Sequence, residues 1–216
     1  MIGLPLNRLL IPRAPPPIRI SEVEENALPA PRGAMAILAF VFASTWFVTG
    51  AMAAHLPRLL EIAGASTTAA IAAAALVGPA QVAVRLVEIG ALRMVHPLVS
   101  ACLAALLHPI GAVILAVVGS GAITAFAVLH GAGNGLLTIA KGTVPLAIFG
   151  PVGYGLRSGI LGAPARATQA ASPLLFGLLM DYMGIGVLAI SASLSMSALF
   201  ALLMLRARPR AAPAPA

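Results

Sequence analysis

Hydrophobic residues in this chain occur in long runs, separated by short segments that hold most of the charged, Gly and Pro residues. Six of these runs are long enough to cross a lipid bilayer as helices, which takes about 20 mostly apolar residues. They cover approximately residues 33–54, 64–85, 97–118, 122–141, 158–180 and 184–205. Between the third and fourth runs, the sequence Gly-Ser-Gly at 119–121 is suited to a tight turn. The pattern predicts an all-α integral membrane protein with six transmembrane helices.

The composition supports this prediction, because the chain has too few charged residues to cover a water-facing surface. Its 216 residues are 60% hydrophobic and 9% charged, whereas soluble domains are about one quarter charged. The mean hydropathy is +1.02. No Lys, Arg, Asp or Glu occurs from residue 94 to residue 140, an interval long enough for two spans. We therefore expect the lipid bilayer to surround most of the chain.

The domain organisation follows from the same pattern. Residues 33–205 form one transmembrane domain, residues 1–32 a Pro-rich cytoplasmic tail, and residues 206–216 a disordered cytoplasmic tail. The first segment has no uninterrupted apolar core of signal-peptide length and is broken by Arg8 and Arg13. We expect it to be a tail and not a signal.

The net charge of +7 comes from basic residues spread thinly between the apolar runs. They lack interleaved aromatic residues, so we expect no nucleic-acid partner. Lys and Arg are retained on the cytoplasmic side of membrane proteins. If the amino terminus is cytoplasmic, the outer segments hold only Arg58, and the inner segments hold eleven basic residues: Arg8, Arg13, Arg19, Arg32, Arg85, Arg93, Lys141, Arg157, Arg206, Arg208 and Arg210. Both termini are therefore expected in the cytoplasm.

The fourth apolar run carries His130, Asn134, Thr138 and Lys141 at steps of four, four and three residues. At about 100° per residue these side chains form one stripe along a helix. Lipid cannot hydrogen-bond them, so the stripe should face protein or a wet cavity. It is either part of a substrate or proton path, or a seam of interhelical hydrogen bonds, which contribute only about 0.6 kcal/mol each. Lys141 can also snorkel to the inner interface.

Two other runs carry polar groups on one face. Gln81, Arg85 and Glu88 lie at steps of four and three, and the last step permits an Arg85–Glu88 ion pair. In the fifth run, Arg166 should point inward together with Gln169, because a charge facing lipid is costly. If the helix begins later, at the prolines of PARATQAASP, Arg166 would instead lie at the interface. Arg85 and Glu88 could likewise be an interfacial pair that only marks topology.

The remaining polar residues give weaker signals. Thr45 and Thr49 can line the same cavity or bond only to their own helix. Gly131 and Gly135 have the GxxxG spacing of close helix packing. Cys102 is the single cysteine, and the other histidines lack a second ligand at metal spacing. We expect no metal and no cofactor.

Four segments together resemble a known family: HLPRLLEIAGAS, ALVGPAQVAVRLVE, HGAGNGLLTIAKGTVPLAIFG and PVGYGLRSGILGAPARATQAASPLLFGLLMD. They are similar to the carboxy-terminal half of bacterial major facilitator superfamily (MFS) transporters, over residues 33–205, and residues 1–32 resemble the linker between the halves of that family. The resemblance implies two inverted three-helix repeats in the bacterial inner membrane, which move a small solute by alternating access. It also implies that the first and fourth spans face the cavity, that the third and sixth are peripheral, and that Arg85 and Glu88 form a cytoplasmic gate.

Family members have twelve spans, whereas this chain has length for six. The chain is therefore expected to be a truncated or split product, or to work with a second six-helix half or as a homodimer. Because Arg85, Lys141 and Arg166 outnumber the nearby acid Glu88, an anionic or polar solute is favoured. If protons drive transport, His130 and Glu88 are the carriers that this half offers.

Two alternatives to transport remain at this stage. The chain could be a non-transporting membrane protein, acting in assembly or inactive. It could also be an intramembrane hydrolase, for which Ser120 is flanked by glycines. Such a serine needs a histidine on a later helix, and no histidine follows His130. We therefore expect a protein that is not an enzyme.

Overall fold

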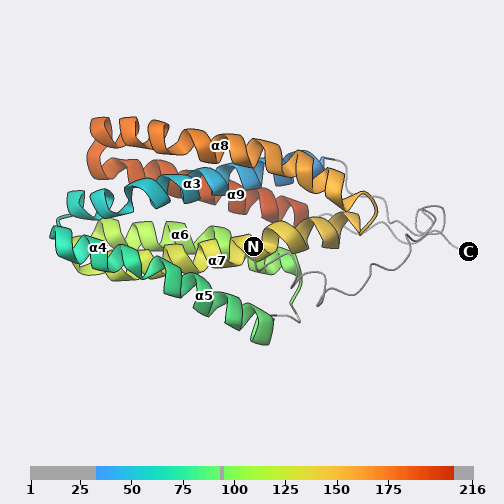
Figure 1. The fold of residues 1–216 in the computed structure, drawn as a ribbon, viewed down its shortest axis with the longest axis horizontal. Helices are drawn as coiled ribbons and strands as arrows, with labels where there is room; N and C mark the ends of the chain where they lie inside the picture. Colours follow the sequence, from blue (N-terminus) through green and yellow to red (C-terminus); the bar gives the residue numbers. More distant parts are fainter. Residues whose placement is uncertain (1–32, 93–94, 207–216) are drawn as a thin grey trace, which may run out of the picture.

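A computed structural model describes residues 33–92 and 95–206, which form helices joined by short turns, with no strand among them (Figure 1). The predicted tails, apart from Arg206, lie outside these residues, as does Arg93. The helices are α3 (Ala34–Ile62), α4 (Thr67–Ala75), α5 (Val77–Val87), α6 (Pro97–Val118), α7 (Ile123–Phe149), α8 (Tyr154–Met183) and α9 (Val187–Arg206). A π-helical turn, Glu88–Leu92, continues α5, and short 3-10 turns, Gly119–Ala122 and Gly184–Gly186, precede α7 and α9.

Four helical stretches of the described chain are long and apolar enough to cross a membrane: Ala34–Ile62, Thr67–Gly90, Pro97–Phe149 and Tyr154–Leu205. Composition explains them, since these segments hold few charged residues over windows of bilayer length. The described chain is therefore all-α, with the apolar helices expected of a multi-pass membrane protein.

The last two stretches are 53 and 52 residues long, and each reverses direction at a glycine. Gly119 has φ +70° and Gly184 has φ +56°, in the left-handed region that favours glycine. The amide of Gly119 bonds the carbonyl of Leu115, and that of Gly184 bonds the carbonyl of Met180, which ends each helix. The turn predicted at residues 119–121 is thus confirmed. As a result α7 runs back beside α6, and α9 runs back opposite to α8 (Figure 1).

Several helices extend further than the apolar runs predict, because prolines do not end them. Helices α3 and α7 continue through Pro57 and Pro145, past the predicted ends at 54 and 141.

Helix α8 begins at Tyr154 and contains Pro164 and Pro173, both within the predicted run. Proline 173 has no amide hydrogen to give to the carbonyl of Gln169. The hydroxyl of Ser172 donates to that carbonyl instead, at 2.8 Å. A side chain thereby satisfies a group that the apolar surroundings would leave unbonded.

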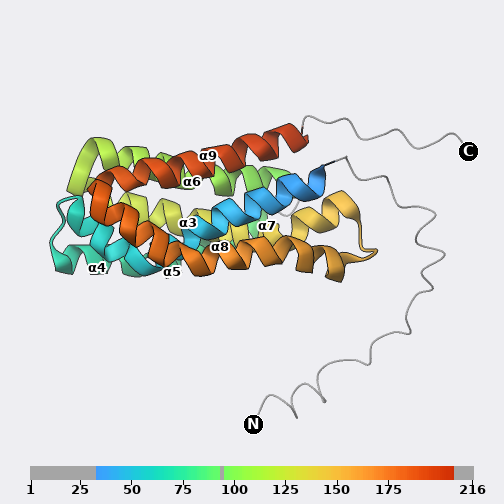
Figure 2. The same cartoon turned by 90° about the horizontal axis from the view of Figure 1, so that it is seen from above.

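The chain divides into two triplets: α3, α4 with α5, and α6 form the first, and α7, α8 and α9 form the second. The main helix contacts join a helix of one triplet to a helix of the other, in a pattern that is the same for both triplets. Helix α3 of the first triplet packs against α8 and α9 of the second. Helix α7 of the second triplet packs against α5 and α6 of the first, and α6 packs against α9 (Figures 1 and 2). The start of α3 and the end of α9 lie at the same end of the bundle (Figure 2).

Glycines allow the closest of these contacts. A methyl group at Gly131 of α7 would lie 2.7 Å from the carbonyl oxygen of Val77, and one at Gly135 would lie 2.8 Å from that of Gln81, both in α5. A methyl group at Gly50 of α3 would lie 2.9 Å from the carbonyl oxygen of Gln169 in α8. The packing role predicted for the GxxxG pair is confirmed, and α3 uses the same device against α8.

The apolar core is divided into two main clusters along the bundle. One, near the turns that precede α7 and α9, includes Phe126, Phe176 and Met180. The other, toward the start of α3 and the end of α9, includes Phe42 and Leu202. Buried histidine, serine and threonine side chains lie among these helices, so that the interior is not uniformly apolar.

Candidate functional site

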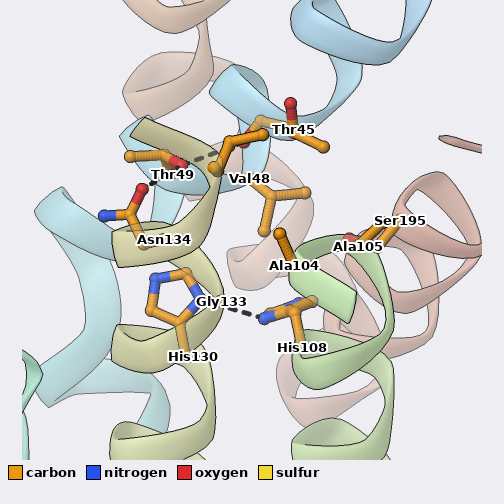
Figure 3. A pocket seen from close by; sticks show the side chains of 11 residues that line it. Thr45, Val48, Thr49, Ala104, Ala105, His108, His130, Gly133, Asn134 and Ser195 are labelled. Atoms are coloured by element: carbon orange, nitrogen blue, oxygen red, sulfur yellow. Dashed lines mark hydrogen bonds between the residues drawn. The ribbon is translucent and has the colours of Figure 1, made fainter. Parts of the chain in front are cut away.

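A small, partly open cavity lined by apolar and polar side chains lies between α3, α6, α7 and α9 (Figure 3). Its volume is about 20 Å³, which is room for a water molecule. It is lined by Thr45, Val48, Thr49, Ala104, Ala105, His108, His130, Gly133, Asn134, Leu137 and Ser195. Of the predicted site residues, this cavity brings together Thr49, His130 and Asn134.

Thr49 and Asn134 connect α3 to α7 across the cavity. The hydroxyl oxygen of Thr49 lies 3.1 Å from Oδ1 of Asn134 and 3.0 Å from the carbonyl oxygen of Thr45 (Figure 3). The hydroxyl of Thr45 donates to the carbonyl of Val41 at 2.7 Å. Each threonine therefore bonds to its own helix and also lines this cavity.

His130 forms a buried contact with His108 of α6. The two Nδ1 atoms are 3.1 Å apart, and Nε2 of His108 is 3.0 Å from the hydroxyl oxygen of Ser191 in α9. Phe126 packs against both rings, with centroid separations of 5.5 and 6.2 Å. The sequence alone did not indicate these contacts, because the partners of His108 are 22 and 83 residues away along the chain and leave no local pattern.

The direction of the hydrogen bonds that link His130, His108 and Ser191 follows from the bond that Ser191 donates. The hydroxyl of Ser191 donates to the carbonyl of Leu188 at 3.0 Å, so its oxygen accepts from Nε2 of His108. Nδ1 of His108 then accepts from Nδ1 of His130. The result is a directed chain from His130 through His108 and Ser191 to a backbone carbonyl. It satisfies polar groups that would be costly to bury alone.

The rest of the predicted stripe lies further along α7 and reaches α5. The hydroxyl of Thr138 is exposed, accepts from Nη2 of Arg85 at 3.3 Å and donates to the carbonyl of Asn134 at 2.9 Å. The stripe thus contacts α6 through His130, α3 through Asn134 and α5 through Thr138. It lies on the side of α7 where these three helices meet.

The ion pair that the sequence permitted between Arg85 and Glu88 does not form. Among the described residues, the ion pair with a nitrogen–oxygen distance below 4 Å is that of Arg58 with Asp181. Its distance is 2.7 Å, and both side chains are exposed.

Glu88 begins the π-helical turn that follows α5. Its backbone is still α-helical and its amide bonds the carbonyl of Val84, so Arg85 and Glu88 remain three residues apart on the helix. The guanidinium of Arg85 instead donates to the hydroxyl of Thr138 in α7. Gln81 is half-buried on α5, beside α7.

A second cluster, which we call the basic cluster, consists of Trp46, Lys141, Arg166 and Gln169. The ammonium nitrogen of Lys141 lies 4.5 Å from the centre of the Trp46 ring, and the guanidinium carbon of Arg166 lies 5.1 Å from it. Nη1 of Arg166 is 3.4 Å from Oε1 of Gln169. The structure therefore brings Arg166 and Gln169 together, with Arg166 exposed on the bundle. It adds Trp46, which no sequence pattern indicated.

Cation–π contacts offset only part of the free-energy cost of placing the charges of Lys141 and Arg166 within a bilayer. Such contacts stabilise a cation by about 0.5 to 2 kcal/mol. A charged side chain at the centre of a bilayer costs about 2.5 to 3.5 kcal/mol on insertion scales, and more on an isolated helix. Arg166 is exposed and Lys141 half-buried on this surface of the bundle. The basic cluster therefore needs water or an anion in addition to the ring.

A larger hollow of about 640 Å³ lies between α6 and α9. It is lined mainly by aliphatic side chains: Leu106, Pro109, Ile110, Val113, Ile114, Ala189, Ala192, Ser193 and Met196. No charged side chain lines it, so its chemistry suits acyl chains and not a polar solute. Within residues 33–92 and 95–206, no three His, Cys, Asp or Glu side chains come close enough to hold a metal ion.

No protein-family model matches this sequence, and no curated protein shows significant similarity to it. Function is therefore inferred from two features of the molecule. The first is the set of equivalent helix contacts between the two triplets. The second is the set of polar side chains on α3 and α7, with the basic cluster beside them.

Proposed function

We propose that this chain is a membrane transport protein of the MFS type, forming a six-helix half that moves a small solute by alternating access. In this proposal the 53- and 52-residue stretches each cross the membrane twice, so that α3, α4 with α5, α6, α7, α8 and α9 are six spans. Each of these helices, or helix pairs, approaches or exceeds the length that a bilayer requires.

The observation that carries the proposal is that the two triplets make equivalent helix contacts with each other. Dividing the chain after α6 makes α3 equivalent to α7, α4 with α5 equivalent to α8, and α6 equivalent to α9. The contacts of α3 with α8 and α9 then correspond to those of α7 with α5 and α6. A triplet contains an odd number of crossings, so two successive triplets have opposite orientation. This is the arrangement of inverted repeats in secondary transporters.

The solute pathway in this proposal follows the face shared by α3 and α7. Thr49, His130 and Asn134 line the cavity there, and Thr138, Lys141, Arg166, Gln169 and Gln81 continue toward the inner end. Arg85 and Glu88 act at the cytoplasmic gate, with Arg85 held by Thr138. The exposure of Thr138 and Arg166 supports a partner on this face, either a second copy or a separate six-helix half. The membrane is the bacterial inner membrane, with both chain termini in the cytoplasm.

Access to water at Asn134 tests the pathway without knowledge of the solute. Single cysteines at Asn134 and at Val113 are compared in a Cys102→Ala background in proteoliposomes. A hydrophilic, membrane-impermeant thiol reagent is expected to modify position 134 and not position 113, which lines the aliphatic hollow. Reaction at 113 with none at 134 contradicts the pathway. A folded protein with neither reactivity nor solute flux supports the alternative of a non-transporting membrane protein.

Hydrolysis is a second candidate function, because Ser191 and His108 lie at the distance of a nucleophile and its base. Ser191 is fully buried and donates its proton to a backbone carbonyl, whereas a nucleophile must donate it to the base. Transport is therefore favoured. A fluorophosphonate probe distinguishes the two functions, since modification of Ser191 would support hydrolysis and an unmodified protein is expected.

A further inference from the structure

In the basic cluster two cations lie against one aromatic ring, and the three side chains belong to three different helices. Trp46 belongs to α3, Lys141 to α7 and Arg166 to α8. Resting on the transport function proposed above, we infer that this cluster binds a carboxylate group of the solute, so that the solute is a small organic anion. The cluster, and not the histidine cavity, is then the point that selects for charge.

The position of the cluster along the helices makes an unneutralised charge unfavourable. Trp46 and Arg166 each lie twelve residues from the start of their helices, and Lys141 lies eight residues before the end of α7. At 1.5 Å per residue these are depths of about 18, 18 and 12 Å. The helices have 27 to 30 residues, roughly 40 to 45 Å, so their ends extend beyond a hydrocarbon core of about 30 Å. The cluster therefore lies within the hydrocarbon depth.

No carboxylate of the described residues neutralises the cluster. Asp181 is paired with Arg58 at the opposite end of the bundle, and Glu61 lies at that same end of α3. Glu88 forms no ion pair within 4 Å. The positive charges of Lys141 and Arg166 lie 4.5 and 5.1 Å from the centre of the same ring, so they repel each other. An anion between them would relieve this repulsion and satisfy both charges.

The donors of the cluster are suited to a carboxylate. Arg166 uses one nitrogen on Gln169, which leaves guanidinium hydrogens for a charge-assisted pair with carboxylate oxygens. Lys141 contributes an ammonium group. Nε1 of Trp46 is buried and has no hydrogen-bond partner within the described structure, and it is a donor only. Lys141 and Arg166, which lie over the same ring, thus keep donors that a carboxylate can accept from.

Trp46 is the only tryptophan of the chain, so its fluorescence reports on this cluster directly. The full chain in phosphatidylcholine nanodiscs is titrated with succinate, citrate and benzoate, and with the neutral analogues succinamide and benzamide. We expect a saturable change in Trp46 emission with at least one carboxylate and not with its neutral analogue. Lys141→Gln and Arg166→Gln should each weaken the apparent affinity at least tenfold. Arg58→Gln, at the opposite end, is the matched control and should leave it unchanged.

Several outcomes overturn the inference. One is equal response to the carboxylates and the neutral analogues, or no response to any of them. Another is binding that survives Lys141→Gln and Arg166→Gln, which places the anion elsewhere. A third is loss of the carboxylate response in phosphatidylglycerol nanodiscs, which would make the cluster a lipid headgroup site.

Flux measurements separate this inference from the proposed function. Carboxylate binding at Trp46 without flux in sealed vesicles contradicts transport and leaves the anion site standing. Flux of a neutral solute that is unchanged in Lys141→Gln and Arg166→Gln contradicts the anion site and leaves transport standing.

Discussion

His108 and His130 bond each other in the interior of the bundle. Each ring is buried, and their mutual contact is 3.1 Å long. Removing one ring leaves a polar group of the other without a partner, at a cost of about 1 to 3 kcal/mol. Replacing both by apolar side chains removes that cost. The pair is therefore better tested by a double-mutant cycle than by single variants.

We predict that His130→Leu and His108→Leu each lower the thermal stability, and that the double variant is more stable than the sum of the two changes indicates. The coupling free energy should be at least about 0.5 kcal/mol. Thermal unfolding in detergent measures it, with Ser197→Ala as the control, because Ser197 is exposed and bonds only to its own helix. Additive effects would contradict a direct contact between the rings.

His130→Ala should also reduce solute flux by about tenfold if the cavity lies on the pathway, equivalent to the loss of about 1.4 kcal/mol of interaction. The measurement is flux into proteoliposomes at matched protein level, once a transported solute is identified. Unchanged flux would remove His130 from the pathway and leave it as a packing residue.

At the scale of helices, the contact between α5 and α7 depends on glycine. Helix α5 has no buried residue of its own, so its attachment rests on how closely it approaches α7 (Figure 1). Gly131 and Gly135 permit that approach, because a side chain at either position would meet the α5 backbone. The equivalent contact of α3 with α8, at Gly50, shows that the fold uses small residues at both crossings.

We predict that Gly135→Ala destabilises the protein, whereas Gly142→Ala does not. Alanine favours a helix over glycine by about 1 kcal/mol at both positions of α7. At position 135 the new methyl group would lie 2.5 Å from Cγ1 of Val84 and 2.8 Å from the carbonyl oxygen of Gln81. At position 142 the nearest atom is the hydroxyl of Tyr154, at 3.6 Å. The overpacking cost of about 1 to 3 kcal/mol should dominate at 135.

Thermal unfolding of the two alanine variants, side by side, checks this difference. A Tm for Gly135→Ala equal to or above that of Gly142→Ala would mean that α5 does not approach α7 as closely as described.

At the scale of the whole molecule, the turns of the bundle lie at two opposite ends. The turn that holds Ser120 lies at one end, and the turn between α7 and α8 lies at the other, with the start of α3 and the end of α9 (Figures 1 and 2). If the six crossings are correct, these two turns must face opposite sides of the membrane. The excess of Lys and Arg predicts that the second end is cytoplasmic.

We predict that cysteine at position 120 reacts with an impermeant thiol reagent in intact cells, and that cysteine at position 151 reacts only after the cells are permeabilised. Both Ser120 and Pro151 are exposed in turns, and Cys102 is first replaced by Ala. Reaction of both positions in intact cells would mean that the stretch between them does not cross the membrane. The reverse pattern would invert the orientation.

The apolar runs were a sufficient guide to the helices because the bilayer imposes a length and a composition on each span. The third run, predicted at 97–118, coincides with α6, Pro97–Val118. Other boundaries were predicted too short, because α3 and α7 continue through Pro57 and Pro145, and α8 begins before its predicted start. The second run proved to be two helices, α4 and α5. In α8 the hydroxyl of Ser172 replaces the hydrogen bond lost at Pro173, and a linear pattern does not reveal this.

The sequence by itself determined the all-helical class, the apolar helices, the glycine turn and the stripe on α7, because these follow from local composition and from a period of 3.6 residues. Only the tertiary structure decided that His108 meets His130, that Arg85 bonds Thr138 and not Glu88, and that Lys141 and Arg166 share Trp46. These contacts join residues far apart in the chain. They exist because glycine crossings and turns set the distance between helices, and a one-dimensional pattern carries no such information.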